Sequence, residues 1–240
     1  MKNNFLTLLF LIFSVGVLAG VPDAKISHEN WDKLLQANVS ESGDVNYEGF
    51  KSSIAKLDQY LSSLSKASPK SDWSRNEKLA YWINAYNAFT IKLILNNYPL
   101  TSIQEINGGK AWDLKFIEIE GSKYSLNQIE NEIIRPQFKE PRIHFAVNCA
   151  AKSCPKLNNQ AFMPSDLDRQ LEKMTVEFVN NSQKNQLKEQ SISISKIFDW
   201  YKQDFTANGT LIDFLNKYSE VKIASSASVS FKDYNWELNK

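Results

Sequence analysis

Residues 75–97 constrain the fold of this 240-residue chain more than any other segment. The preceding Ser74-Arg75-Asn76-Glu77 has the pattern of a capping box, in which Ser74 and Glu77 each satisfy a backbone N–H at the start of a helix. Pro99 predicts that this helix ends near Asn97. Residues 79–89, LAYWINAYNAF, are apolar on nearly every side, which is typical of a buried helix. The rest of the chain must therefore pack around this helix.

Asn84 and Asn87 are the polar exceptions on this helix. They lie three positions apart, so both point to nearly the same side. A buried amide that finds no partner costs roughly 1–3 kcal/mol. The two side chains therefore either hold a neighbouring loop in place, which we favour, or line a functional site.

The spacing of apolar residues and turn residues predicts the other elements. Helical spacing indicates helices at 26–37, 47–64, 125–134, 167–179, 197–205 and 211–218. Alternation indicates a hairpin over 116–124 and short strands at 142–148, 192–194 and 221–224. Helices and strands do not alternate regularly, so we expect a helix-rich α+β fold with a small, mainly antiparallel sheet.

The N-terminal residues predict export from the cytoplasm. Met1-Lys2-Asn3-Asn4 is a short positive start, and the apolar run Phe5 to Ala19 that follows is too short to span a bilayer. We expect a signal peptide over residues 1–19 and a single domain over residues 20–240, in the periplasm or outside the cell. A buried N-terminal helix is the alternative, but the run has no polar face.

The charge balance limits the class of partner. The 28 Lys and Arg residues against 27 Asp and Glu residues become 27 against 27 once Lys2 leaves with the signal. No net field remains to attract nucleic acid, and no second apolar run has membrane length. Glycine-rich phosphate loops and zinc-like ligand spacings are missing as well, so we expect no cofactor and no metal. A small molecule or a peptide is the expected ligand.

Residues 144–155, HFAVNCAAKSCP, contain both cysteines and one of the two histidines. Cys149 is the better candidate nucleophile because it leaves a predicted strand into small residues, whereas Cys154 precedes a proline. His144 is the candidate base, but five residues of straight strand would hold it on the order of 16 Å from Cys149, on the opposite face. A direct Cys149–His144 pair therefore requires a sharp bend.

A disulfide is the second interpretation of this segment. Compartments outside the cytoplasm favour paired cysteines, and closing so short a loop would stabilise the fold by roughly 2 kcal/mol. The bond would also remove Cys149 as a resting nucleophile. Three alternatives stay open: a Cys149–Cys154 disulfide, a free catalytic Cys149, or two inert buried thiols.

Two further stretches carry polar or aromatic groups in apolar surroundings. Glu130 follows Ile129, so it can orient a histidine or form an ion pair with Arg135 or Arg142, of which the ion pair is favoured. Residues 198–205, FDWYKQDF, can form a sugar-stacking surface, although their helical spacing is more typical of a core.

Four segments resemble the bacterial domain-of-unknown-function 547 family: residues 77–88 (EKLAYWINAYNA), 125–130 (SLNQIE), 144–155 (HFAVNCAAKSCP) and 197–205 (IFDWYKQDF). The resemblance extends from about Trp31 to the Tyr234-Asn235-Trp236 stretch. Family members often carry Ile-Glu-His where this chain has Ile129-Glu130-Asn131, so one candidate base is missing here. The family has no agreed activity. A remote likeness of the family to papain or transglutaminase cores implies a cysteine hydrolase or acyltransferase.

In the enzymatic hypothesis, Cys149 attacks an amide or ester carbonyl and His144 or another group takes the proton. Asn84 or Asn148 then holds the oxyanion, and Glu130 orients the base. The alternative is a non-catalytic envelope binding or structural module, in which a disulfide closes the cysteine segment.

Overall fold

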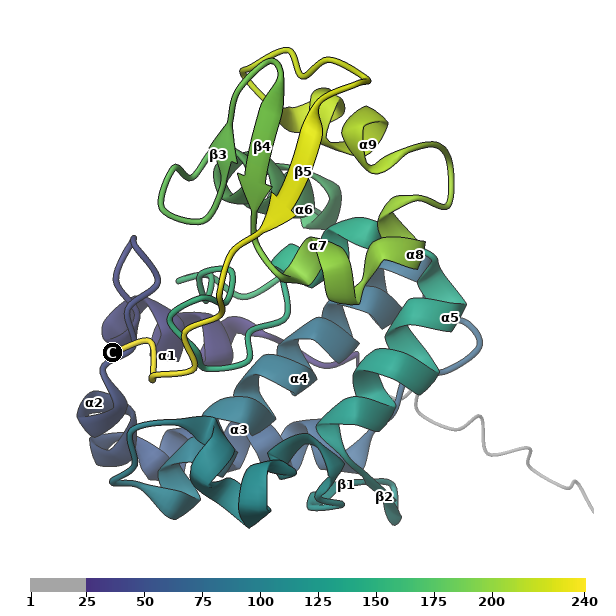
Figure 1. Ribbon diagram of the computed structural model, residues 1–240. Helices are drawn as coiled ribbons and strands as arrows, with labels where there is room; N and C mark the ends of the chain where they lie inside the picture. The colour runs from purple at the N-terminus through teal and green to yellow at the C-terminus, as the bar shows by residue number, and fades with distance from the viewer. Residues whose placement is uncertain (1–24) are drawn as a thin grey trace, which may run out of the picture.

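Helix α4 (Arg75–Asn97) runs through the middle of the molecule, with other helices on several sides of it (Figure 1). The computed structural model describes residues 25–240, so the predicted signal peptide over residues 1–19 lies outside the described residues. The predicted capping box is confirmed, because Ser74 Oγ accepts from the Glu77 N–H and the Glu77 carboxylate accepts from the Ser74 N–H. Every residue from Leu79 to Ile91 is buried, as expected of a central helix.

The N-terminal half of the chain surrounds the lower part of α4. Its elements are α1 (Glu29–Asn38), α2 (Tyr47–Ser52), α3 (Ile54–Lys66), the 3-10 helices η1 (Ile103–Gly109) and η2 (Ala111–Asp113), and the hairpin strands β1 (Ile117–Ile119) and β2 (Ser122–Tyr124). α3 packs against both α1 and α4. The helix predicted over 47–64 is split at Ser53, and the predicted hairpin is confirmed with Ile117 paired to Tyr124.

The C-terminal half forms the upper part and the right side in Figure 1. Its elements are the π-helix η3 (Gln128–Ile134), α5 (Arg135–Phe138), the 3-10 helix η4 (Pro141–Phe145), α6 (Leu167–Val179), β3 (Gln186–Leu187), β4 (Ser191–Ile194), α7 (Ile197–Trp200), α8 (Lys202–Phe205), α9 (Leu211–Tyr218) and β5 (Ser228–Phe231). β4 lies between an antiparallel β3 and a parallel β5. The chain is thus helix-rich α+β, as predicted.

Two predicted strands are wrong. Residues 142–148 begin as η4, in which Ile143, His144 and Phe145 are all buried, whereas a strand would alternate between its faces. Proline at the first turn presets its φ angle for a helix. Around 221–224, the Asn216 amide hydrogen-bonds to both the N–H and the C=O of Ile223, so these groups cannot pair with a strand. The last strand forms later, as β5.

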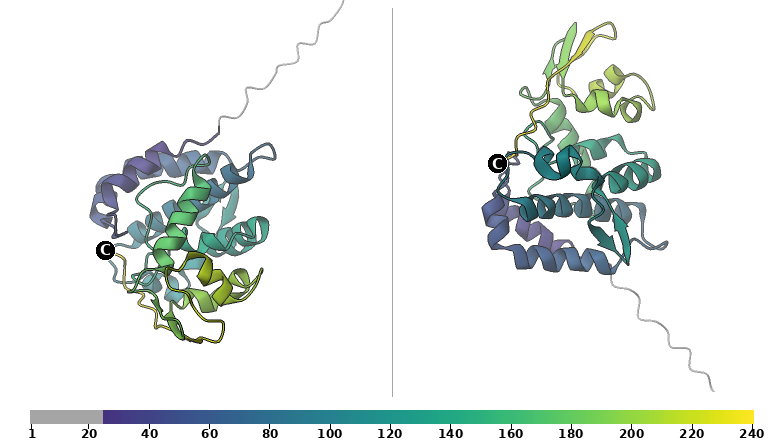
Figure 2. Two further views of the ribbon diagram at one scale, coloured as in Figure 1. Left: turned by 90° about the horizontal axis from the view of Figure 1, so that it is seen from above. Right: turned by 60° about the horizontal axis from the view of Figure 1, so that its bottom comes forward.

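The C-terminal tail, residues 232–240, joins the two halves. After β5 it crosses from the upper sheet back to the lower helices, where the chain ends (Figures 1 and 2). Isolated bridges pair Glu237 with Ser102 and Leu238 with Ala151, and the Val45 N–H donates to the Asn239 carbonyl. The tail therefore lies over the cysteine segment and fixes its position.

Asn84 and Asn87 hold two loops against α4, which confirms the favoured interpretation. The Asn84 amide donates to the Phe162 carbonyl at 2.8 Å and accepts from the Phe162 N–H at 3.0 Å. Asn87 donates to the Ala146 carbonyl at 2.9 Å and accepts from the Asn148 N–H at 2.8 Å. Because both amides are buried, they replace the water that these backbone groups have lost.

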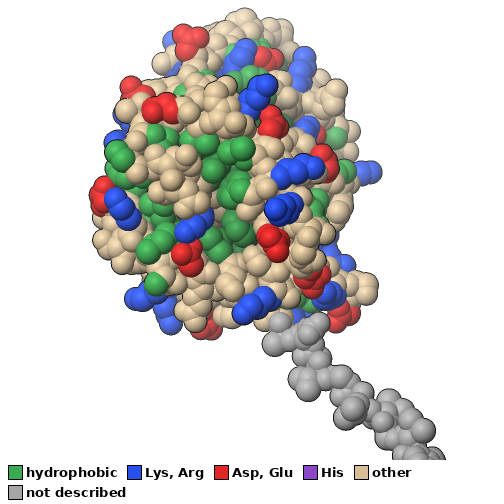
Figure 3. Space-filling view, turned by 90° about the horizontal axis from the view of Figure 1, so that it is seen from below, with side chains coloured by type: hydrophobic (Ala, Val, Ile, Leu, Met, Phe, Trp, Pro, Cys, Tyr) green, Lys and Arg blue, Asp and Glu red, His purple; other side chains and the backbone are tan. Residues whose placement is uncertain are grey.

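The described residues contain no membrane-spanning helix, and the face drawn in Figure 3 carries no large patch of one charge. Within residues 25–240, no helix combines the length and apolar composition needed to cross a bilayer. Figure 3 shows acidic and basic side chains intermixed around apolar ones. This face therefore has no broad field of one sign, in agreement with the balanced composition.

We expect Asn84→Ala to lower the free energy of unfolding by about 2–4 kcal/mol, because two buried backbone groups of Phe162 lose their partners. Asn96→Ala is the matched control, since Asn96 is exposed on the same helix; its effect should stay within about 0.5 kcal/mol. Urea denaturation of both variants measures the difference. Equal stabilities of the two variants would contradict the role given to Asn84.

Candidate functional site

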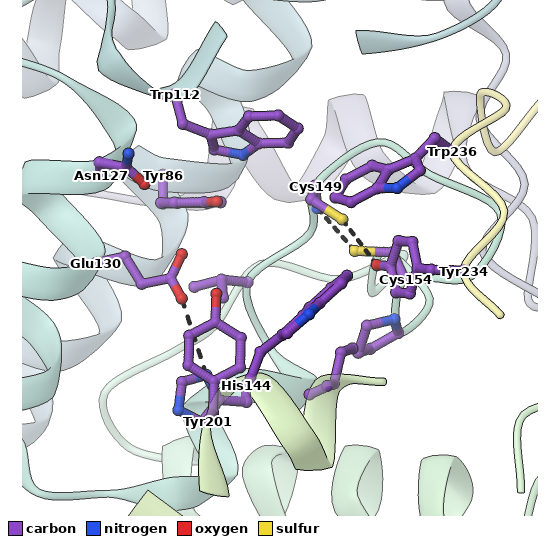
Figure 4. A pocket seen from close by; sticks show the side chains of 14 residues that line it. Tyr86, Trp112, Asn127, Glu130, His144, Cys149, Cys154, Tyr201, Tyr234 and Trp236 are labelled. Carbon is purple, nitrogen blue, oxygen red and sulfur yellow. Dashed lines mark hydrogen bonds and ion pairs between the residues drawn. The ribbon is translucent and has the colours of Figure 1, made fainter. Parts of the chain in front are cut away.

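A cavity of about 250 Å³ opens where α4, the cysteine segment, α7 and the C-terminal tail meet. Its walls are mainly aromatic, and its polar lining comes from two thiols, an amide, a carboxyl and an imidazole (Figure 4). The aromatic side chains come from four different parts of the chain: Tyr86, Trp112, Trp200, Tyr201, Tyr234 and Trp236. Cavities of this kind, with few polar groups among aromatic walls, are typical sites for small organic ligands.

The backbone beside Cys149 is held by a second asparagine. The Asn148 amide donates to the Pro155 carbonyl at 2.7 Å and accepts from the Ala150 N–H at 2.9 Å, which closes the loop from within. Ala150 has φ 59°, a left-handed conformation that is costly for alanine and often found at functional sites. An amide, rather than a covalent bond, thus fixes the shape of this segment in the structure.

Cys149 and Cys154 are unbridged and lie side by side at one wall of the cavity. Cys149 is partly exposed, whereas Cys154 is buried. The Cys149 N–H donates to Cys154 Sγ at 2.8 Å, and Cys149 Sγ lies 3.1 Å from the Tyr234 hydroxyl.

The two thiols differ in acidity because burial dominates the pKa of Cys149, whereas hydrogen bonds dominate the pKa of Cys154. Burial raises the pKa of the Cys149 thiol, and the neighbouring Cys154 raises it further. Burial alone would also raise the pKa of Cys154, but hydrogen bonds from the Cys149 thiol, the Cys149 N–H and Tyr234 outweigh it and lower that pKa. Of the two thiols, Cys154 therefore loses its proton more readily than Cys149.

His144 faces two carboxyl groups instead of a sulfur. Its Nε2 lies 2.7 Å from Asp204 Oδ2, and its Nδ1 lies 3.8 Å from Glu130 Oε1. The ring stacks on Tyr201 with 3.9 Å between centroids, which fixes its orientation. His144 lies in the 3-10 helix η4 and not in the predicted strand, but its imidazole still faces the carboxyl groups and not Cys149.

Glu130 points into the cavity from the π-helix η3, opposite the two thiols (Figure 4). The wide turn of this helix buries Glu130 together with Ile129 before it. Glu130 Oε1 and His144 Nδ1 are buried side-chain atoms without a hydrogen-bond partner among the described residues. The favoured ion pair of Glu130 with an arginine is wrong, because Arg135 binds Asp204 and Arg142 binds other carboxylates.

The structure thus brings Cys149, His144 and Glu130 to one cavity, as the enzymatic hypothesis requires. The Asn84 and Asn148 amides both donate to backbone carbonyls and neither lines the cavity, so neither is placed to hold an oxyanion there. Other candidate groups also lie elsewhere. His28 is buried against Tyr60, and burial lowers its pKa to about 4. Asn131 is exposed and accepts a hydrogen bond from Arg135. The lack of a histidine at this position therefore does not deprive Cys149 of a base.

Sequence reasoning missed three residues that complete the site. Asp204 holds the His144 ring, and Tyr234 and Trp236 reach the cavity from the C-terminal tail. The predicted aromatic helix over 197–205 is broken at Tyr201 into α7 and α8, and its aromatic residues have two roles. Its phenylalanines are buried in the core, while Trp200 and Tyr201 line the cavity. The Tyr-Asn-Trp stretch of the tail was the sequence signal for Tyr234 and Trp236, but no local pattern links it to the cysteines.

Residues 70–179 match the family described as "Protein of unknown function, DUF547". The chain thus carries a DUF547 region over these residues. No curated protein and no solved structure matches it. The matched DUF547 region includes α4, Glu130 and the whole cysteine segment, whereas Asp204 and Tyr234 lie beyond it. The cavity is therefore built partly by the DUF547 region and partly by the chain that follows.

We expect Asp204→Asn to destabilise the protein by about 1–2 kcal/mol near pH 7, because it weakens charged hydrogen bonds to Arg135 and His144 in a partly exposed position. Burial opposes ionisation of Asp204, but His144 and Arg135 outweigh it and hold its pKa below the ordinary 3.8. The contribution is complete above about pH 4 and disappears as the pH falls through the lowered pKa, so the two proteins should converge in acid.

Thermal or urea unfolding from neutral to acid pH measures this difference. Asp199→Asn is the control, since it removes only an exposed ion pair with Lys196 and should change stability by less than about 0.5 kcal/mol. A difference between Asp204→Asn and the unchanged protein that is constant with pH would rule out the ionic contribution.

Proposed function

We propose that this protein is a cysteine-dependent hydrolase or acyltransferase that acts on an amide or ester held in the aromatic cavity. The observation that carries the proposal is the thiol pair. Cys149 is the partly exposed thiol at the cavity wall, and Cys154 beside it has a lowered pKa. The two groups are in contact, and a thiolate on Cys154 can take up the Cys149 proton as the new sulfur–carbon bond makes that proton more acidic, a role that enzymes of this class usually give to a histidine.

In the first step, Cys149 Sγ forms a bond to the carbonyl carbon while its proton moves to the Cys154 thiolate. The carbonyl π electrons move to the oxygen, and the Tyr234 hydroxyl, 3.1 Å from Cys149 Sγ, can donate to it. Burial keeps the pKa of Tyr234 well above its usual range, so its hydroxyl stays protonated and can donate.

In the second step, the carbon–nitrogen or carbon–oxygen bond breaks and the leaving group takes the proton back from Cys154. The acyl group now forms a thioester on Cys149. Water releases it in a hydrolase, and the hydroxyl or amine of an acceptor releases it in an acyltransferase. His144 takes no part in the first proton transfer, because both ring nitrogens face carboxyl groups.

A non-catalytic binding module in the periplasm or outside the cell is the second candidate. The adjacency of the two sulfurs and the distance of both histidines from them favour it. The predicted signal peptide would direct the chain to an oxidising compartment, where a Cys149–Cys154 disulfide would remove the nucleophile. The cavity would then bind its ligand without changing it.

p-Nitrophenyl acetate tests the proposal on the reduced protein. We expect a burst of p-nitrophenolate and one acetyl group located on Cys149 by peptide mass spectrometry, because Cys149 is the thiol that a substrate can reach. Cys149→Ala should reduce the rate to that of scattered surface lysines. Equal acetylation of the unchanged protein and Cys149→Ala would reject the enzymatic function and leave the binding module.

The proton-accepting role of Cys154 has a separate test. We expect Cys154→Ser to slow acetylation of Cys149 by about 10²-fold near neutral pH, within the range of general acid–base effects. The slowed rate should recover at alkaline pH, where Cys149 ionises without help. An unchanged pH–rate profile would remove Cys154 from the mechanism.

A further inference from the structure

Two buried polar atoms in the cavity have no partner, and they lie close together. Glu130 Oε1 and His144 Nδ1 are 3.8 Å apart, too far for a hydrogen bond to each other. The Glu130 side chain is 5% exposed and the His144 side chain 1% exposed. Leaving such atoms unpaired is unfavourable, so their pairing with a bound molecule would add to its affinity.

An ionised Glu130 carboxylate and a neutral His144 ring would both present acceptors at these two positions. Asp204 is held ionised by Arg135 and His144, so its Oδ2 accepts from the N–H at His144 Nε2. A neutral imidazole that donates from Nε2 carries a lone pair on Nδ1. Glu130 Oε1 also accepts. A group that pairs with both atoms in these states donates at least two hydrogen bonds to atoms less than 4 Å apart.

Charge and wall chemistry select among such donors. Glu130 and Asp204 face His144 from two sides, and Arg135 offsets only one of these carboxyl groups through its two bonds to Asp204. Trp112, Trp200 and Trp236 present ring surfaces to the same cavity. Indole faces attract cations, and a buried carboxylate does so more strongly.

We propose that the cavity binds a protonated primary amine, with its ammonium group between Glu130 and His144. An ammonium group carries three donors and no acceptor, so it can satisfy both unpaired atoms and keep one N–H for another contact. The remainder of the molecule lies along the tryptophans toward the thiols. The cavity of about 250 Å³ suits a small ligand rather than a folded partner.

This inference rests on the proposed function only in that the amine would be part of the substrate of Cys149. Binding of the amine itself does not need Cys149. A metal ion would be a poor alternative occupant, because no three His, Cys, Asp or Glu side chains within residues 25–240 are arranged to hold one. Bound water is the competing explanation, since a water molecule can also donate twice.

Benzylamine and benzyl alcohol separate these explanations, because they differ mainly in the charged, donor-rich group. Titration of the reduced full-length protein, followed by tryptophan fluorescence near neutral pH, gives both dissociation constants. We expect benzylamine, which is protonated there, to bind at least about tenfold more tightly, as a charge-assisted hydrogen bond in a buried site should provide. Equal affinities would mean that water satisfies the two atoms and would overturn the proposal.

Glu130→Gln should abolish the preference for benzylamine while benzyl alcohol binds as before. Glu132→Gln, a change at an exposed carboxylate on the same π-helix, is the matched control and should keep the preference. A preference that survives in a folded Glu130→Gln variant would overturn the assignment. If that variant does not fold, the comparison of the two ligands on the unchanged protein still decides the proposal.

The acetylation experiment is independent of this one. A preference for benzylamine without acetylation of Cys149 would keep the amine site and reject the enzyme. Acetylation without the preference would keep the enzyme and reject the amine site.

Discussion

The buried amides of α4 are the constraint on which the rest of the structure depends. A helix that is apolar on every side can be covered by any well-packed layer, so apolar packing alone does not fix which loop lies where. Asn84 and Asn87 fix the positions of two loops, because each buried amide pairs with one backbone C=O and one backbone N–H of a loop. One amide fixes the loop at Phe162, and the other fixes the segment that leads into Cys149.

The second of these loops determines the chemistry of the site. Asn87 holds the backbone before Cys149, Asn148 closes the loop behind it, and the C-terminal tail covers it. This arrangement keeps two thiols in contact without a covalent bond and brings Tyr234 against Cys149. The opposite wall is fixed independently by the contacts of Asp204 with His144 and Arg135. The cavity thus has two rigid polar walls separated by aromatic surfaces.

Much of the local structure was predictable because its causes are local. The capping box at Ser74 depends on residues three positions apart. The β1–β2 hairpin depends on its own alternation and its Glu-Gly turn. The predictions failed where a distant or neighbouring side chain intervened. The predicted strand at 221–224 does not form because Asn216 occupies the backbone of Ile223.

The sequence by itself determined the central helix, the helix-rich α+β class, and three side chains that line the cavity: Cys149, His144 and Glu130. Each of these follows from periodicity, capping or the crowding of reactive residue types within a short segment. Only the tertiary structure decided that His144 faces Asp204 and Glu130 instead of a sulfur, and that Cys154 is the partner of Cys149. The contact of His144 with Asp204 joins residues 60 positions apart, and the contact of Cys149 with Tyr234 joins residues 85 positions apart. They depend on how the tail and α8 pack, which no local pattern encodes.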